Sequence, residues 1–219
     1  TGVTDCLEHT LRLIPVGKVL AVSLLVLAVL QHWLAHSTQS IILTANTIRL
    51  RVKAQKGADE MQRVNIKETH LSFGDLTQRQ VTDMVVIHHS GNHTDDDLSA
   101  KEIHAGHCAM GWSGIGYHYV VRKDGSVERG RPHWVVGAHA EGENWHTIGI
   151  HVSGNFERGN PTTQQIEALA MLIATICHDY QLPIDKEHVV GPRDLLATAC
   201  PGANLYNELQ TVRGKAIWY

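Results

Sequence analysis

The sequence predicts an α/β fold in which a single mixed β-sheet is flanked by helices. Short β-branched segments alternate along the chain with segments whose apolar residues recur every three or four positions. Interleaved signals of this kind are typical of a sheet covered by helices. With 219 residues, of which 43% are hydrophobic and 19% charged, the chain is long enough for one full domain plus an extension.

The first part of the chain differs from the rest and is expected to form an N-terminal extension. Residues 19–30 are apolar with one exception, and this run is shorter than the ~20 residues that a membrane-spanning helix needs. It is typical of a signal-peptide core or a marginal membrane anchor through residues 19–35, and a buried amphipathic helix is the alternative. Because Met61 precedes all the motifs described below, residues 1–60 are expected to be dispensable and residues 61–219 to form the working domain.

The strongest strand signal is the segment from Thr82 to His89, in which an apolar β-branched run ends in two histidines. Such a strand brings its last side chains to the rim of a sheet, where α/β proteins commonly bind their ligands. Asp124-Gly125 is typical of a hairpin turn between two later strands. Further strands are expected at residues 116–122, 126–130, 134–139, 147–152 and 188–190.

Two helices are predicted by capping boxes, in which a hydroxyl and a side chain three residues later satisfy the first backbone donors. Ser99 with Glu102 begins the first helix, which is expected to end before Gly111. Thr162 with Gln165 begins the second, and the apolar spacing that follows is the clearest amphipathic pattern in the chain.

Three stretches carry the residues that suggest a chemistry. They are Val85-Val86-Ile87-His88-His89-Ser90, Gly114-Ile115-Gly116-Tyr117-His118 and Thr198-Ala199-Cys200-Pro201-Gly202. In this order they resemble the zinc amidases of the N-acetylmuramoyl-L-alanine amidase family, which includes phage lysozyme-type amidases and peptidoglycan recognition proteins. The resemblance covers roughly residues 68–206 and implies the fold of that family for the domain.

The resemblance implies a zinc ion (Zn²⁺) bound by His88 and Cys200. A catalytic zinc needs about three protein ligands and one open position for water. The third ligand of the family lies in a Gly-His-Arg-Asp motif, which here reads Gly191-Pro192-Arg193-Asp194. Proline has no side-chain donor atom, so the expected third ligand is absent. His188 is the nearest histidine, but in an extended chain it would lie roughly 13 Å away, too far to replace the missing ligand. The alternative is that water, or another nearby histidine such as His139, takes the third position.

The resemblance also implies roles for residues around the metal. Tyr117 and Thr198 are the expected catalytic residues, which would polarise the scissile carbonyl and donate a hydrogen bond to the developing oxyanion. His139 and Asn144 are expected to bind substrate. Where many relatives carry a glutamate, this chain has His151, which could act as a general base only if its pKa is near neutral.

The activity implied by the resemblance is zinc-dependent hydrolysis of peptidoglycan, at the amide between N-acetylmuramic acid and L-alanine of the stem peptide. Pro192 is expected to weaken this activity. The first alternative is a non-catalytic peptidoglycan-binding module of the same fold. The second is a membrane-tethered protein that uses the fold against a protein partner, which depends only on the apolar run at residues 19–30.

Charge and cysteine content limit the other partners and the location. The formal net charge of −3 gives no reason to expect nucleic-acid binding. Four cysteines without a CxxC pair indicate no disulfide framework. We expect a monomer whose partner is peptidoglycan, located outside the cell or in the cell envelope. A phage lysin made in the cytoplasm is the alternative.

Overall fold

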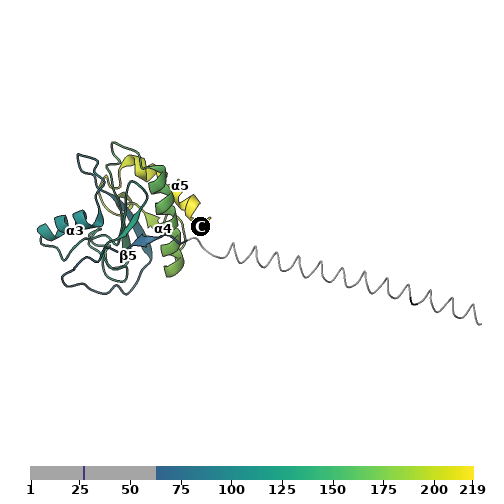
Figure 1. Cartoon of the computed structure of the whole chain (residues 1–219), viewed down its shortest axis with the longest axis horizontal. Coiled ribbons are helices and arrows are strands. Elements are labelled where there is room, and N and C mark those ends of the chain that lie inside the picture. Colours follow the sequence, from purple (N-terminus) through teal and green to yellow (C-terminus); the bar gives the residue numbers. More distant parts are fainter. Residues whose placement is uncertain (1–26, 28–62) are drawn as a thin grey trace, which may run out of the picture. The chain divides into compact units, whose positions relative to one another are not determined.

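A computed structural model of the chain describes Leu27 and residues 63–219 (Figure 1). The apolar run at residues 19–30, and the membrane association expected of it, lie outside the described residues apart from Leu27. Within the described part of the chain, no helix is both long and apolar enough to cross a bilayer. Met61–Tyr219 form one structural unit, and the fold below is that of this unit.

A six-stranded mixed sheet forms the centre of the unit, with the strand order β1-β4-β3-β5-β2-β6. β3 and β4 form an antiparallel hairpin, and the other neighbouring strands are parallel. The predicted fold class is therefore confirmed. The strands are β1 (Ile66–Lys67), β2 (Met84–His89), β3 (Tyr119–Val121), β4 (Val127–Arg129), β5 (Thr147–Val152) and β6 (Val189–Val190).

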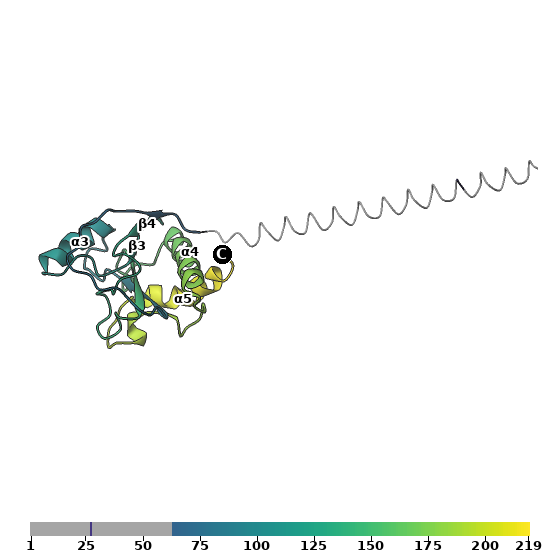
Figure 2. The same ribbon diagram turned by 90° about the horizontal axis from the view of Figure 1, so that it is seen from below.

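Helices cover both faces of the sheet. α3 (Ala100–Ala109) lies on one side, and α4 (Thr163–Tyr180) and α5 (Ala203–Ala216) lie together on the other (Figures 1 and 2). The larger apolar core fills the space between the sheet and the α4–α5 pair, where Ile87 and Ile150 are fully buried. Because side chains alternate along a strand, the residues between these apolar positions point to the α3 side.

Local sequence signals account for two of the three helix starts. Ser99 and Thr162 both form complete capping boxes with the residues three positions later, as predicted. The third helix, α5, was not predicted. It begins directly after Gly202 without a side-chain cap. Its buried residues recur at helical spacing: Leu205, Leu209, Val212 and Ala216.

The prediction of a strand at residues 134–139 is wrong. This segment makes one isolated bridge and otherwise runs as a loop. Beside this bridge, where the Arg79 N–H donates to the Trp134 carbonyl at 2.8 Å, two further carbonyls accept hydrogen bonds from arginine side chains. Arg79 donates from Nη1 to the Val135 carbonyl at 2.7 Å, and Arg131 donates from Nη1 to the Val136 carbonyl at 2.8 Å. The segment is therefore held by one bridge and by arginine side chains, and it does not continue as a strand.

Arg79 is the residue that fixes this loop to the sheet. Its guanidinium is buried, and burial lowers its pKa. It donates to the Thr82 hydroxyl at 2.8 Å and to three backbone carbonyls, those of His133, Val135 and Thr147. A charged donor surrounded by neutral acceptors in this way holds several loop carbonyls that would otherwise be buried without a partner.

We predict that Arg79→Leu lowers the free energy of unfolding by about 2–4 kcal/mol, since it leaves buried carbonyls without donors. Arg63→Leu is the matched control. Arg63 pairs with Asp179 at the surface, and exposed pairs contribute at most about 1 kcal/mol. Urea unfolding of both variants measures the difference. Equal losses in the two variants would show that Arg79 does not hold the loop.

We also predict that residues 61–219 fold without the preceding segment, because every predicted capping box and strand follows Met61. A chain shortened to this range should be soluble and should melt in one cooperative transition. The measurement is circular dichroism during heating, compared with the full chain. Aggregation of the shortened chain under conditions in which the full chain is soluble would place the boundary elsewhere.

Candidate functional site

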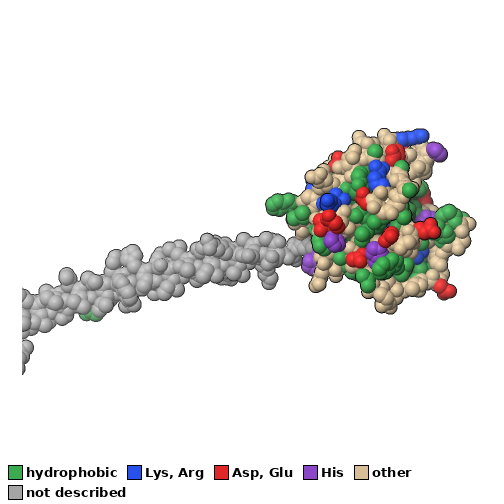
Figure 3. All heavy atoms as spheres, turned by 180° about the vertical axis from the view of Figure 1, so that it is seen from behind, with side chains coloured by type: hydrophobic (Ala, Val, Ile, Leu, Met, Phe, Trp, Pro, Cys, Tyr) green, Lys and Arg blue, Asp and Glu red, His purple; other side chains and the backbone are tan. Residues whose placement is uncertain are grey.

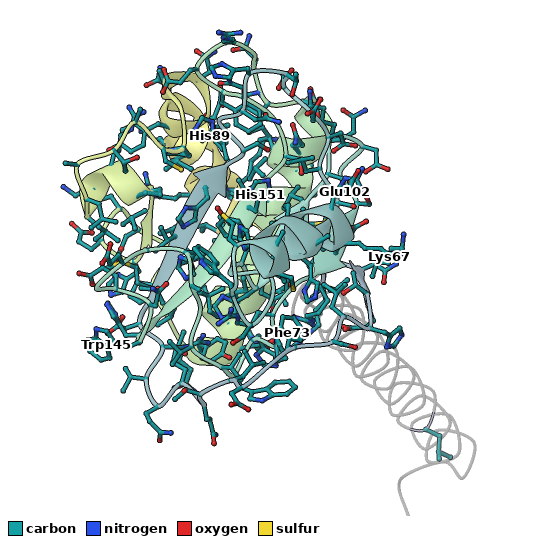
Figure 4. The ribbon with its side chains drawn as sticks, turned by 90° about the vertical axis from the view of Figure 1, so that its left-hand side faces the viewer. Lys67, Phe73, His89, Glu102, Trp145 and His151 are labelled. Atoms are coloured by element: carbon teal, nitrogen blue, oxygen red, sulfur yellow. The ribbon has the colours of Figure 1, made fainter. Side chains whose placement is uncertain are left out.

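One face of the sheet carries several buried histidines, whereas the other is mainly apolar. β2 and β5 pair in parallel with His88 opposite His151, so the two imidazoles lie on the same face. His118 belongs to that face as well, because the Gly149 N–H donates to its Nδ1 at 2.9 Å. These three histidines are at most 4% exposed. Figure 4 shows His151 toward the same end of the sheet as His89.

His88 and Cys200 meet at the rim of this face. Cys200 lies in the loop before α5, 112 positions from His88 in the sequence, and its Sγ is 3.8 Å from His88 Nδ1. The two residues expected to share a zinc ion therefore lie together, and their role as ligands stays a prediction. Two ligands of one tetrahedral zinc, with bonds of ~2.1 Å to nitrogen and ~2.3 Å to sulfur, would lie about 3.6 Å apart. The two atoms thus have the spacing of ligands that share an ion.

The position of the expected third ligand is filled by Pro192, which is buried at the start of the 3₁₀ helix η1 (Pro192–Asp194). The turn is closed around it, because the Leu196 N–H donates to the Pro192 carbonyl at 2.8 Å. Proline suits this place because the first position of a helix needs no N–H partner. Among the described residues, no group of three His, Cys, Asp or Glu side chains is arranged to hold a metal ion. The donor set does not fit a three-ligand zinc site.

Neither histidine considered as a replacement is placed to complete the set. His188 Nδ1 is 2.6 Å from Asp185 Oδ1, within its own turn. His139 Nδ1 is 3.0 Å from His88 Nε2. That is the opposite ring nitrogen from the one that faces Cys200, so His139 lies on the wrong side of the His88 ring.

Tyr117 and Thr198 border the His88–Cys200 pair. The Tyr117 ring lies 5.1 Å from the His88 ring and 4.9 Å from the His151 ring, measured between centroids. Burial, together with the nearby Cys200, raises the pKa of Tyr117, so its hydroxyl keeps its proton. Thr198 is exposed, and its Oγ1 accepts a hydrogen bond from the Cys200 N–H at 3.2 Å. Both residues therefore hold hydroxyl donors beside the pair, and their catalytic roles stay predictions.

His139 and Asn144 are joined to each other. Asn144 Oδ1 accepts from the backbone N–H groups of His139 at 2.7 Å and Ala140 at 2.9 Å, which fixes the loop that carries His139. Both ring nitrogens of His139 have partners, because Nε2 lies 3.3 Å from the Thr147 hydroxyl and Nδ1 faces His88. Their expected roles in substrate binding stay predictions.

The side chains of the site are uncharged at neutral pH. Burial lowers the pKa of His88 well below its usual range and lowers that of His139 and of His151 to about 3. Burial raises the pKa of the Cys200 thiol to about 11. The condition for His151 to serve as a general base, a pKa near neutral, is therefore not met.

Residues 77–203, more than half of the chain, match the family described as N-acetylmuramoyl-L-alanine amidase. The chain belongs to this amidase family. The endolysin of Escherichia phage T7 is 32% identical over 134 residues, which cover 58% of this chain and 85% of the endolysin. Peptidoglycan-recognition protein SC2 of Drosophila melanogaster is 35% identical over 132 residues, which cover 58% of this chain and 71% of that protein.

Solved structures of amidase-family proteins have the same fold. The endolysin amidase LysCS from Clostridium intestinale superposes with a TM-score of 0.63 at 32% identity, covering 69% of this chain and 96% of that one. Drosophila PGRP-LB superposes with a TM-score of 0.60 at 26% identity, covering 67% and 93%. The amidase family is typically zinc-dependent, and this chain has a proline at position 192, where the resemblance places the third ligand.

Two residues that shape the amidase site, Thr147 and Gly149, were not predicted from the sequence. Thr147 is fully buried and contacts His139. A Cβ atom added to Gly149 would come within 2.4 Å of His139 Cγ. A glycine inside a strand often marks the close approach of another group, and this signal was available in the sequence.

We predict that the buried histidines make the domain sensitive to acid. His151 is neutral when folded, with a pKa of about 3, but it gains a proton near pH 6.5 when unfolded. Its contribution to stability is fully present above about pH 6.5 and is lost as the pH falls toward 3. At pH 5 the loss is about 2 kcal/mol for one such histidine.

The measurement is the free energy of unfolding at pH 8 and at pH 5 for the unmodified chain and for His151→Gln. This substitution should reduce the difference between the two pH values by about 2 kcal/mol, whatever its constant cost. His178→Gln removes an exposed histidine and should leave the difference unchanged. If His151→Gln also leaves it unchanged, His151 is not held neutral in the fold.

Proposed function

We propose that residues 61–219 bind peptidoglycan and that hydrolysis of the amide between N-acetylmuramic acid and L-alanine is slow or absent in this chain. Peptidoglycan as the ligand is supported by membership of a family that comprises peptidoglycan amidases and peptidoglycan-recognition proteins. This ligand also fits the expected location outside the cell or in the cell envelope, which stays part of the proposal.

Pro192 carries the proposal that catalysis is impaired. Zinc-dependent amide hydrolysis needs an ion held firmly enough to activate water, and such sites use three protein ligands. His88 and Cys200 supply two donors, and the buried proline supplies none. With a thiol pKa of about 11 and His88 neutral, the pair also lacks the thiolate that a nucleophilic cysteine would need.

The remaining side chains are suited to bind the amide groups of a ligand. Tyr117 keeps its hydroxyl proton, and Thr198 exposes a hydroxyl at the rim. Hydroxyls of this kind can pair with peptide carbonyls without the cost of removing a charge from water. Figure 3 shows histidine, acidic and apolar side chains lying side by side on one face of the molecule.

The test combines binding and cleavage with the full chain and purified, insoluble peptidoglycan. We expect the chain to sediment with peptidoglycan and to release at most roughly 1% of the stem peptide released by phage T7 endolysin under the same conditions, equivalent to about 2.7 kcal/mol or more in the barrier. If the chain stays in the supernatant, the binding proposal is wrong. If it releases peptide at a rate comparable to the endolysin, the proposal of impaired catalysis is wrong.

An active amidase is the second candidate, favoured by the 3.8 Å separation of His88 Nδ1 and Cys200 Sγ. This separation would be retained in a chain that still binds zinc through two side chains and water. Stoichiometric zinc after dialysis, together with peptide release, would support this second candidate for the unmodified chain.

We predict that Pro192→His increases the affinity for zinc by roughly 100-fold or more, because it adds the third side-chain donor that a firmly bound catalytic zinc requires. Pro192→Ala is the matched control, since it removes the ring without adding a donor. The measurement is competition for Zn²⁺ with a coloured chelator. Equal affinity in the histidine and alanine variants would show that position 192 does not face the His88–Cys200 pair.

A further inference from the structure

Four side chains of the site form one continuous chain of polar contacts. Cys200 Sγ lies 3.8 Å from His88 Nδ1, and His88 Nε2 lies 3.0 Å from His139 Nδ1. His139 Nε2 lies 3.3 Å from Thr147 Oγ1, and the Thr147 hydroxyl donates to the Glu143 carbonyl at 2.7 Å. Each imidazole is thus engaged at both ring nitrogens.

The Thr147 end of this series of contacts determines which ring nitrogen of His139 and of His88 carries the proton. A threonine hydroxyl has one proton, and that of Thr147 is given to the Glu143 carbonyl, which can only accept. Thr147 Oγ1 therefore accepts from His139, so the His139 proton is on Nε2. His139 Nδ1 must then accept from His88 Nε2–H, which leaves an unshared electron pair on His88 Nδ1.

The backbone is shaped to hold the His139 ring in this position. Added Cβ atoms would come within 2.4 Å of His139 Cγ at Gly149 and within 2.5 Å of its Cδ2 at Gly137. Glycine at both places lets the imidazole pack directly against the sheet and the loop. Thr147, which sets the direction from donor to acceptor in these polar contacts, is fully buried. It is two positions before Gly149 on the same strand.

We infer that His139 is a positioning residue which, together with Thr147, holds His88 in the tautomer with its proton on Nε2 and its Nδ1 electron pair directed at Cys200. This role differs from substrate binding, because no ring nitrogen of His139 is left for a ligand. It does not depend on the proposed function, since it concerns protons within the folded chain.

The consequence is a His88 nitrogen that can only accept. Histidines that donate one N–H to a fixed acceptor present the other nitrogen to a metal ion or to an acidic hydrogen. Here the group facing that nitrogen is the Cys200 thiol. The protein therefore retains the hydrogen bond that would orient His88 as a metal ligand, although Pro192 occupies the position of the expected third ligand.

The test is nitrogen NMR of the imidazoles in the full chain, without added metal, at neutral pH. We expect protons on Nε2 of both His88 and His139, unprotonated Nδ1 atoms, and a scalar coupling between His88 Nε2 and His139 Nδ1 across their hydrogen bond. A proton on His88 Nδ1, or a proton on His139 Nδ1, would overturn the inference without any variant.

Three variants separate positioning from general support of the fold. Thr147→Val should abolish the preference of His139 for the Nε2 proton and the coupling to His88, and Thr147→Ser should restore both. Gly149→Ala should displace the His139 ring and also abolish the coupling. Gly106→Ala is the matched control, since an added Cβ there meets nothing within 4 Å. A coupling that persists in folded Thr147→Val would overturn the role of Thr147.

Discussion

The parallel pairing of β2 with β5 is the constraint on which the rest of the structure depends. Its register sets His88 beside His151, and the alternation of side chains sends Ile87 and Ile150 to the opposite face. One face can then be covered by α4 and α5 as an ordinary apolar core. The other face carries buried neutral imidazoles. They are expected to lower the free energy of unfolding in acid, and their hydrogen bonds can hold them in defined tautomers. A slip of one residue would exchange the two faces and leave neither a core nor a site.

Much of this fold could be predicted from the sequence because its signals are local. The apolar run before His88, the two capping boxes and the Asp124-Gly125 turn each specify structure through neighbouring residues. The loop at residues 134–139 could not, because the Val135 carbonyl accepts its hydrogen bond from the side chain of Arg79, which is 56 positions away in the sequence. Apolar content alone does not distinguish a buried loop held by arginine from a strand.

The site was predictable to the extent that it depends on motif residues. The approach of Cys200 to His88 and the absence of a donor at Pro192 follow from short motifs, whereas the place of His139 depends on Thr147 and on the space above Gly149. Under the proposed function, two of the expected ligand residues without the third do not make a catalytic zinc site. His88 Nε2 is held by His139 Nδ1 at 3.0 Å. Among the described residues, no third metal-binding side chain joins His88 Nδ1 and Cys200 Sγ.

We propose that this amidase fold holds two protein donors for a metal and not three. X-ray diffraction from crystals of the full chain soaked in Zn²⁺, with data collected on both sides of the zinc absorption edge, tests it most directly. We expect no fully occupied zinc with three protein ligands in the described domain, and water should complete the coordination of any zinc near Cys200. A strong anomalous peak bound by His88, Cys200 and a third side chain would contradict it.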